Sequence, residues 1–211
     1  MRMDPVSICR RRGRGLYLAA LVLASGAMST VTDEAQAGRE RSAVDRRYYD
    51  SWGLSPDDPE ANAHFAARMA EVQRFTEAAD YYRQALRLRP DYPEAHFYFA
   101  MMLTSQNKPD EALPHFQAVV GSGIEYESTA HTNMGLIYGR RGEGDKALTH
   151  FQRAVELDPD QSDARFNLGL SLLRHQRPEA ALEQFEAALL LAEESGDRDL
   201  IREIRQYLAV P

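Results

Sequence analysis

The sequence contains almost no cysteine and has no excess of positive charge. Cys9 is the single cysteine among 211 residues, and one thiol can form neither an intramolecular disulfide nor a cysteine metal cluster. The net charge is −7, and from residue 38 onward 20 basic residues stand against 29 acidic ones. This balance argues against a nucleic-acid partner, because nucleic-acid binders need basic surface to displace counterions. It argues equally against docking on anionic lipid.

The apolar stretch near the N-terminus is too short to cross a bilayer comfortably. It runs from Leu16 to Met28, 13 residues, whereas a membrane-spanning helix needs about 20. Four arginines between residues 10 and 14 precede it, and together they are typical of a secretory signal peptide. We therefore predict a signal peptide over residues 1–37, with cleavage after Ala37 favoured over Ala27. An uncleaved N-terminal anchor is the alternative.

Either reading of the N-terminus places the rest of the chain outside the cytoplasm. We expect an exported, periplasmic protein in a Gram-negative-type envelope. A secreted protein, or one anchored facing the periplasm, remains the alternative. No membrane contact is expected beyond such an anchor.

What the sequence does contain is an internal repeat. The stretch YRQALRLRPDYPEAHFYFA, from Tyr82, has the same pattern as FQRAVELDPDQSDARFNLG, from Phe151. This offset fits two supersecondary units, and an intermediate copy divides it. The copies begin at Pro59, Pro93, Ser128 and Ser162, at spacings of 34, 35 and 34 residues.

Each copy has the pattern of two helices joined by a short turn. Apolar residues recur at spacings of three and four, which indicates helices. Small residues occupy the eighth and twentieth places, where we expect two helices to approach closely because packed interiors tolerate overfilling poorly. Asn107 and Gly142 fit a left-handed turn between the helices, and Pro109 and Pro178 fit the start of the second helix. The eighth-place residues are Ala66, Ala100, Gly135 and Gly169.

The period, together with EAADYYRQALRLRP, EALPHFQAVV, KALTHFQRAVELDP and AALEQFEAALLL, resembles the tetratricopeptide repeat family, in its exported bacterial type. The resemblance covers Pro59 to about Leu191 and implies an all-α fold. The expected form is a right-handed α-solenoid of about four helix–turn–helix units with a C-terminal capping helix. The predicted parts are an N-terminal extension (38–58), four repeats within 59–192 (59–92, 93–127, 128–161 and 162–192) and the capping helix (193–211).

Two features depart from the family pattern, and two segments lie outside the repeats. The fourth place of each copy lacks the Trp often found there, and the second copy carries an extra residue in GSGIEYES, where we expect a slightly altered stacking angle. Leu200, Ile204 and Leu208 lie on one face of a helix, as a solenoid cap requires. Tyr48, Tyr49 and Trp52 are expected either to pack on the first helix or to engage a partner or a second copy of the chain.

No motif for catalysis is apparent. A Gly-rich phosphate loop and a nucleophile motif are both missing, and the carboxylate pairs lie on solvated helix faces. His96 and His131 share one place of the repeat, and His115 and His150 share another. Equivalent places of stacked repeats lie roughly 10 Å apart, whereas metal ligands sit about 2 Å from their ion. We predict no enzymatic activity, no metal and no cofactor.

In tetratricopeptide proteins the first helices of successive copies line a concave surface. The resemblance therefore implies a partner-binding groove. Aromatic residues and Met would form an adaptable apolar floor, two Asn could pair with a peptide backbone, and two Arg could hold a carboxylate. Ala63 and Ala67 stand where the family's clamp for chaperone tails has Lys and Asn, so that clamp is absent. The predicted groove residues are Phe97, Tyr98, Met101, Asn133, Leu136, Arg140, Phe166, Asn167, Leu170 and Arg174.

The predicted function is a non-catalytic protein–protein interaction scaffold or adaptor in the cell envelope. It would bind a peptide segment of a partner protein in the groove, or bind by the edge of the array. The alternative is a self-associating structural or assembly factor of a pilus, secretion or cytochrome-maturation system. The expected partner is a protein or peptide, and self-association is possible.

Overall fold

The structure is a computed structural model that describes residues 55–209, and within this range it contains helices and no strand. The predicted signal peptide and the residues Tyr48, Tyr49 and Trp52 lie outside the described residues. The described helices are α3 (Pro59–Glu71), α4 (Phe75–Leu88), α5 (Pro93–Ser105), α6 (Pro109–Val119), α7 (Glu127–Arg140), α8 (Gly144–Leu157), α9 (Ser162–Arg174), α10 (Pro178–Ser195) and α11 (Arg198–Leu208).

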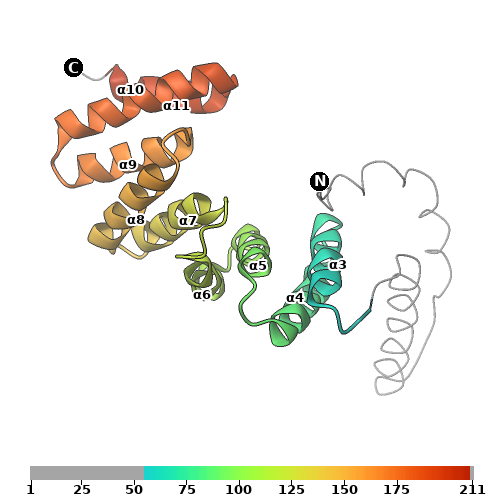
Figure 1. The fold of residues 1–211 in the computed structure, drawn as a ribbon. Helices are drawn as coiled ribbons and strands as arrows, with labels where there is room; N and C mark the ends of the chain where they lie inside the picture. The colour runs from blue at the N-terminus through green and yellow to red at the C-terminus, as the bar shows by residue number, and fades with distance from the viewer. Residues whose placement is uncertain (1–54, 210–211) are drawn as a thin grey trace, which may run out of the picture. The chain divides into compact units, whose positions relative to one another are not determined.

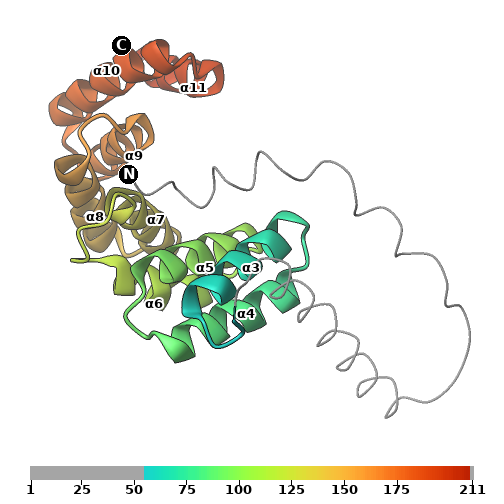
Figure 2. The same cartoon turned by 45° about the vertical axis from the view of Figure 1, so that its right-hand side comes forward.

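The helices pack as four consecutive pairs followed by a single helix. The pairs are α3 with α4, α5 with α6, α7 with α8, and α9 with α10. The second helix of each pair also contacts the first helix of the next, and α11 packs on α10 (Figures 1 and 2). This arrangement confirms the predicted class, an all-α solenoid of four helix–turn–helix units with a helix at the C-terminal end.

The turns inside the four pairs share one backbone conformation at the fifteenth place of the copy. Gln73, Asn107, Gly142 and Gln176 have φ of 61°, 58°, 75° and 57°. The amide that follows each of them bonds a carbonyl five residues back, as Lys108 does to Leu103 at 2.9 Å. A left-handed residue of this kind ends a helix and satisfies its last carbonyls. The turn was predicted at Asn107 and Gly142, whereas the two glutamines carry no such signal.

The two helices of a pair approach closely at the eighth place. A Cβ atom added to Gly135 would lie 2.6 Å from the Phe151 ring, and one added to Gly169 would lie 2.6 Å from the Phe185 ring. Real Cβ contacts of that length essentially do not occur, so the ring can pack on the facing backbone only because the side chain is missing. The expectation of small residues at this place is confirmed.

The extra residue of the second copy lies in the connection between α6 and α7. Gly121 and Gly123 adopt positive φ there, at 82° and 70°. Both amides donate to the buried Glu127 carboxylate, at 2.8 and 3.0 Å. The insertion thus forms a loop that is closed by a carboxylate at the first residue of α7. The altered stacking angle stays a prediction.

The C-terminal end of the array differs from the repeat pattern in its helix bounds. α10 continues past residue 192 to Ser195, where Gly196 ends it with φ of 75°. The Asp197 side chain then caps α11 by accepting bonds from the Asp199 and Leu200 amides. Leu200 and Ile204 are buried, which places the apolar face of α11 against the last pair.

Candidate partner-binding surface

Three large apolar side chains predicted for the groove are exposed on two neighbouring first helices. Tyr98 and Met101 of α5 are 39% and 38% exposed, and Leu136 of α7 is 38% exposed. Asn133 of α7 places its amide 3.7 Å from the Met101 sulfur, so these residues belong to adjoining parts of one surface. We call Tyr98, Met101 and Leu136 the apolar surface.

Phe97 and Phe166 are buried, so the expectation that they face a partner is corrected. Phe97 stacks on Tyr126, with ring centroids 4.7 Å apart, and meets Phe116 edge-on. Phe166 packs against the rings of Phe185 and Tyr207. Both rings therefore lie inside the array, where they pack against aromatic rings of the segments that follow in the chain.

The two predicted amides are oriented by their own helices. Asn133 donates to the Thr129 carbonyl at 2.9 Å, and Asn167 donates to the Asp163 carbonyl at 2.8 Å. Both are half-buried, as is Leu170. One amide hydrogen of each Asn is thereby engaged, which leaves the side chain held in a defined orientation on the surface.

Arg140 and Arg174 are exposed and make no ion pair with any residue in the range 55–209. Other basic residues of the array do have acidic partners. Arg68 pairs with Glu71, and Arg153 pairs with Glu156. Arg140 is the last residue of α7 and Arg174 is the last residue of α9, and both present their charge to solvent.

Tyr126 belongs to this site, although the sequence did not point to it. Its hydroxyl accepts a bond from the Tyr98 hydroxyl at 3.0 Å, while its ring stacks on Phe97. The contact with Glu125, followed by the bond to Tyr98, raises the pKa of Tyr126. Tyr126 therefore positions Tyr98 and extends the aromatic surface toward the α6–α7 loop. The irregular spacing of GSGIEYES is the signal that could have drawn attention to it.

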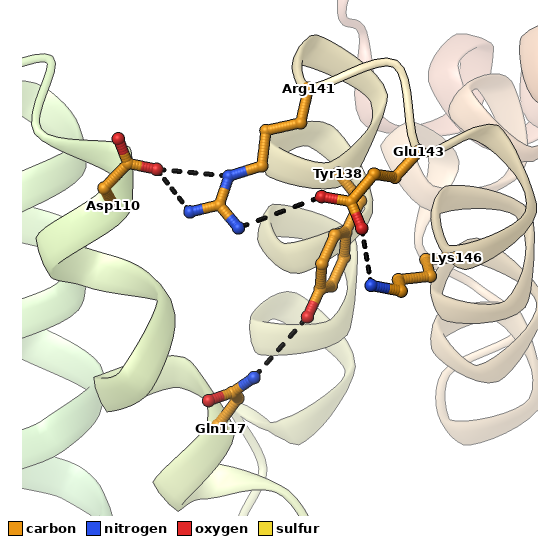
Figure 3. A network of polar contacts seen from close by, with 6 residues as sticks. All are labelled: Asp110, Gln117, Tyr138, Arg141, Glu143 and Lys146. Carbon is orange, nitrogen blue, oxygen red and sulfur yellow. Dashed lines mark hydrogen bonds and ion pairs between the residues drawn. The ribbon is translucent and has the colours of Figure 1, made fainter.

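A polar network fastens the second pair to the third, as Figure 3 shows. Asp110 at the start of α6 accepts from Arg141 at the end of α7, with Nε to Oδ1 at 3.1 Å. Arg141 and Lys146 both pair with Glu143. At the next junction, His175 takes the place of Arg141 and lies 3.1 Å from Asp145. These contacts link neighbouring pairs.

Residues 55–209 hold no group of three or more His, Cys, Asp or Glu side chains that could bind a metal ion. Within the same range, no helix has both the length and the apolar character that a bilayer span demands. The structure does bring histidines together within a copy, which the comparison of equivalent places between copies did not anticipate.

The comparisons with known proteins agree with this architecture. The family profile described as Tetratricopeptide repeat matches residues 70–127 and 132–198. A search of curated protein sequences found no match.

Three solved structures illustrate the likeness in fold. MamA 41-end from Desulfovibrio magneticus RS-1 is 23% identical, covers 77% of this chain and 93% of its own, and has a TM-score of 0.60. YrrB, described as a TPR protein with an unusual peptide-binding site, is 22% identical with 82% and 88% covered and a TM-score of 0.60. The pilF protein of Pseudomonas aeruginosa is 18% identical with 85% and 89% covered and a TM-score of 0.61.

Proposed function

The chain belongs to the tetratricopeptide repeat family, and from this premise we propose that it is a non-catalytic scaffold of the cell envelope. It binds a segment of a partner protein on the surface formed by the first helices of its repeats. The observation that carries the proposal is the exposed apolar surface on α5 and α7, together with two exposed arginines at the ends of α7 and α9 that have no acidic partner among residues 55–209. An exposed apolar patch of this kind usually marks a contact surface.

The chemistry of the surface indicates the partner segment. Tyr98, Met101 and Leu136 offer aromatic and aliphatic contacts, and Met adapts to varied shapes. Arg140 and Arg174 can each hold a carboxylate through two parallel hydrogen bonds. The partner segment therefore carries apolar residues that contact α5 and α7. It also carries acidic residues that pair with the arginines at the ends of α7 and α9. The printed description of YrrB as peptide-binding supports a peptide as the ligand class.

The location in the envelope rests on the N-terminal sequence. Four arginines followed by 13 apolar residues have the layout of an export signal. A periplasmic array would meet the partner outside the cytoplasm. Detection of the chain, shortened at its N-terminus, in the periplasmic fraction supports this location, and recovery of the uncut chain in the cytosol contradicts it.

Site-specific photocrosslinking tests the surface. A photoreactive residue at position 136 is expected to capture a partner, and Arg140→Glu with Arg174→Glu is expected to abolish the capture. A photoreactive residue at position 190, where Leu190 is exposed on α10, serves as the control. Equal capture from both positions, or capture that survives the two charge reversals, would contradict the proposed surface.

Self-association is the second candidate function, and the residues that favour it are Tyr48, Tyr49 and Trp52. Three large aromatic residues within five positions form a ready contact for a neighbouring copy. Sedimentation of the chain with and without residues 38–57 distinguishes the two functions. A monomer in both cases eliminates this candidate, whereas an oligomer that requires the segment supports it.

A further inference from the structure

The two middle repeats each contain a pair of histidines in direct contact. His96 of α5 faces His115 of α6, with 2.9 Å between their Nδ1 atoms. His131 of α7 faces His150 of α8 with the same separation. Both pairs join the first helix of a repeat to its second, and in both the ring centroids lie 5.1 Å apart.

These distances define a head-on contact. Ring atoms lie about 1.1 Å from the centre of a five-membered ring with bonds near 1.33 Å. A centroid separation of 5.1 Å with nitrogens 2.9 Å apart therefore puts the centroids and nitrogens close to one line. Two ligands of a shared metal ion would instead direct their lone pairs to a point beside that line. The geometry is that of an N–H···N hydrogen bond, which needs one proton between the two rings.

The surroundings of the first pair determine which ring donates. His96 Nε2 lies 3.1 Å from the Pro90 carbonyl, and a carbonyl only accepts, so this nitrogen carries a hydrogen. A neutral His96 then has a bare Nδ1, and His115 must donate to it. Protonation of both rings would put a hydrogen on each Nδ1 and set two N–H groups against each other.

We propose that the two histidine pairs are an acid-sensitive device, in which each pair holds the helices of a middle repeat together while it shares one proton. One added proton charges a single ring and leaves the N–H···N bond in place, but protonation of both rings puts a hydrogen on each Nδ1, which removes the bond and adds charge repulsion. Acid then loosens α5 from α6 and α7 from α8, the helices that carry or support the apolar surface.

Burial and nearby basic groups favour the neutral state of His115 in the first pair. His96 and His115 line a hollow of about 610 Å³, and Asp80, Arg83 and Arg87 of α4 and Glu111 of α6 line the same hollow. Burial, followed by the neighbouring His96 and Arg83, lowers the pKa of His115 to about 4. The two carboxylates and the two guanidinium groups of the hollow balance in number.

The second pair lies in a similar setting. Burial lowers the pKa of His131, with Glu127 opposing and Arg153 adding to the effect. Burial and then the charge of His131 lower the pKa of His150. On its open side His150 stacks on Tyr138, with ring centroids 5.2 Å apart. The groups that reach Tyr138 are Gln117 of α6 and Lys146 of α8, so the side chains on this side are neutral or basic.

The outer repeats use other residues at the same two places. In the last copy, Arg165 donates to the Gln184 side chain at 3.2 Å and to the Pro159 carbonyl at 2.6 Å. In the first copy, Asn62 bonds the Pro56 carbonyl at 2.7 Å. Neither Arg nor Asn changes its charge between pH 4 and 7. The last copy thus keeps the contact between the two places without histidine, and only the two middle copies have a histidine at both places.

The sign of the pH dependence follows from the lowered pKa values. An unfolded His titrates near 6.5, so below that pH the unfolded chain binds more protons than the folded one, and stability falls. For His115 the loss begins near pH 6.5 and is complete near pH 4. His175 acts in the opposite direction: its bonds to the Ser171 carbonyl and to Asp145 raise its pKa, so it stabilises in acid and loses that effect as the pH rises.

The test is a double variant, His115→Gln with His150→Gln. Glutamine already stands at this place in the last copy and keeps an N–H donor for the facing ring. Urea unfolding of the purified chain is measured at pH 7.5 and 5.0. The unfolding constant is expected to rise in both chains as the pH falls from 7.5 to 5.0. The rise in the unchanged chain should be at least about tenfold larger than the rise in the double variant. Hydrogen exchange in acid is expected to be fastest in α5 to α8.

His64→Gln is the matched control, because His64 is exposed on α3 and outside both pairs. The proposal is overturned if the unfolding constant rises equally in the unchanged chain and in the double variant. It is also overturned if His64→Gln reduces this rise as much as the double variant does. Should the double variant fail to fold, NMR titration of the unchanged chain decides. A His115 ring that titrates below pH 5 supports the device, and one that titrates near 6.5 overturns it.

Discussion

At the scale of single residues, Gly or Ala occupies the eighth place of each copy, where the two helices of a pair approach closely. Gly135 of α7 packs directly under the Phe151 ring, and a Cβ there would come within 2.6 Å of it. The first two copies have Ala at this place, paired with Tyr82 and Phe116. The later copies have Gly at this place, and the Phe ring of the second helix occupies the space that a Cβ would take.

Gly135→Ala is expected to lower the free energy of unfolding by about 1–3 kcal/mol, because the buried Phe151 ring must shift from its packed position. Gly139→Ala, in the same helix, is the control, since its Cβ would meet only the Ala147 Cβ at 3.9 Å. That control should gain up to about 1 kcal/mol from helix propensity. Urea denaturation measures both, and a stabilised Gly135→Ala chain would refute the close-packing account.

The buried Glu127 carboxylate is the residue that accommodates the extra residue of the second copy. Glu127→Gln is expected to cost about 1–3 kcal/mol, because one of the two glycine amides loses its charged acceptor. Glu183→Gln, on the exposed face of α10, should leave the free energy of unfolding within about 0.5 kcal/mol. Chemical denaturation at neutral pH checks the difference, and equal effects of the two changes would argue against the capping role.

At the scale of elements, helix ends are determined by a few backbone groups. All four intrapair turns end their first helix with a left-handed residue, although only Gly142 is a glycine. Asn is among the residues that tolerate this conformation, whereas Gln73 and Gln176 adopt it at a steric cost. The packing of the paired helices outweighs that cost.

The start of α11 depends on one side chain. Asp197→Ala is expected to cost about 1 kcal/mol, because the amides of Asp199 and Leu200 both lose their acceptor. Asp199→Ala is the charge-matched control, since Asp199 is exposed and only pairs with Arg202 along the helix. Thermal unfolding compares the two variants. If Asp199→Ala lowered the midpoint as much as Asp197→Ala, charge and not capping would account for the effect.

At the scale of the whole array, each pair of helices is stabilised by its neighbours. The contacts join consecutive helices, and polar bridges such as Asp110–Arg141 link the second pair to the third. Stability in such an array is close to a sum of repeat and junction contributions. Damage at one end should therefore remain near that end.

Ile204→Ala tests this locality. Ile204 is fully buried in the contact of α11 with the last pair, and its truncation is expected to cost about 2–4 kcal/mol. Hydrogen exchange should accelerate in α9, α10 and α11 and remain unchanged in α3 and α4. Ile201→Ala, at a half-buried site of the same helix, should have a smaller effect. Uniform acceleration across the chain would contradict a nearest-neighbour array.

The period, the pairing of helices and the small residues at the eighth place could be read from the amino-acid sequence alone. These properties follow from spacing along the chain, because a helix repeats its faces every three to four residues. The sequence also pointed to Tyr98, Met101 and Leu136 as groove residues; they are exposed, and their contact with a partner stays a prediction. The sequence could not distinguish a side chain on the surface from one just beneath it. Phe97 and Phe166 were therefore predicted to face a partner, although both are buried.

Which side chains of different helices meet depends on how the helices pack in three dimensions. Tyr126 reaches Tyr98 because the inserted loop returns toward α5, and His96 reaches His115 because two helices of one copy pack at a particular rotation. Neither contact is encoded in a spacing along the chain, since each depends on the packing of side chains between helices. The repeat thus specified the architecture, while packing set the surface and the histidine pairs.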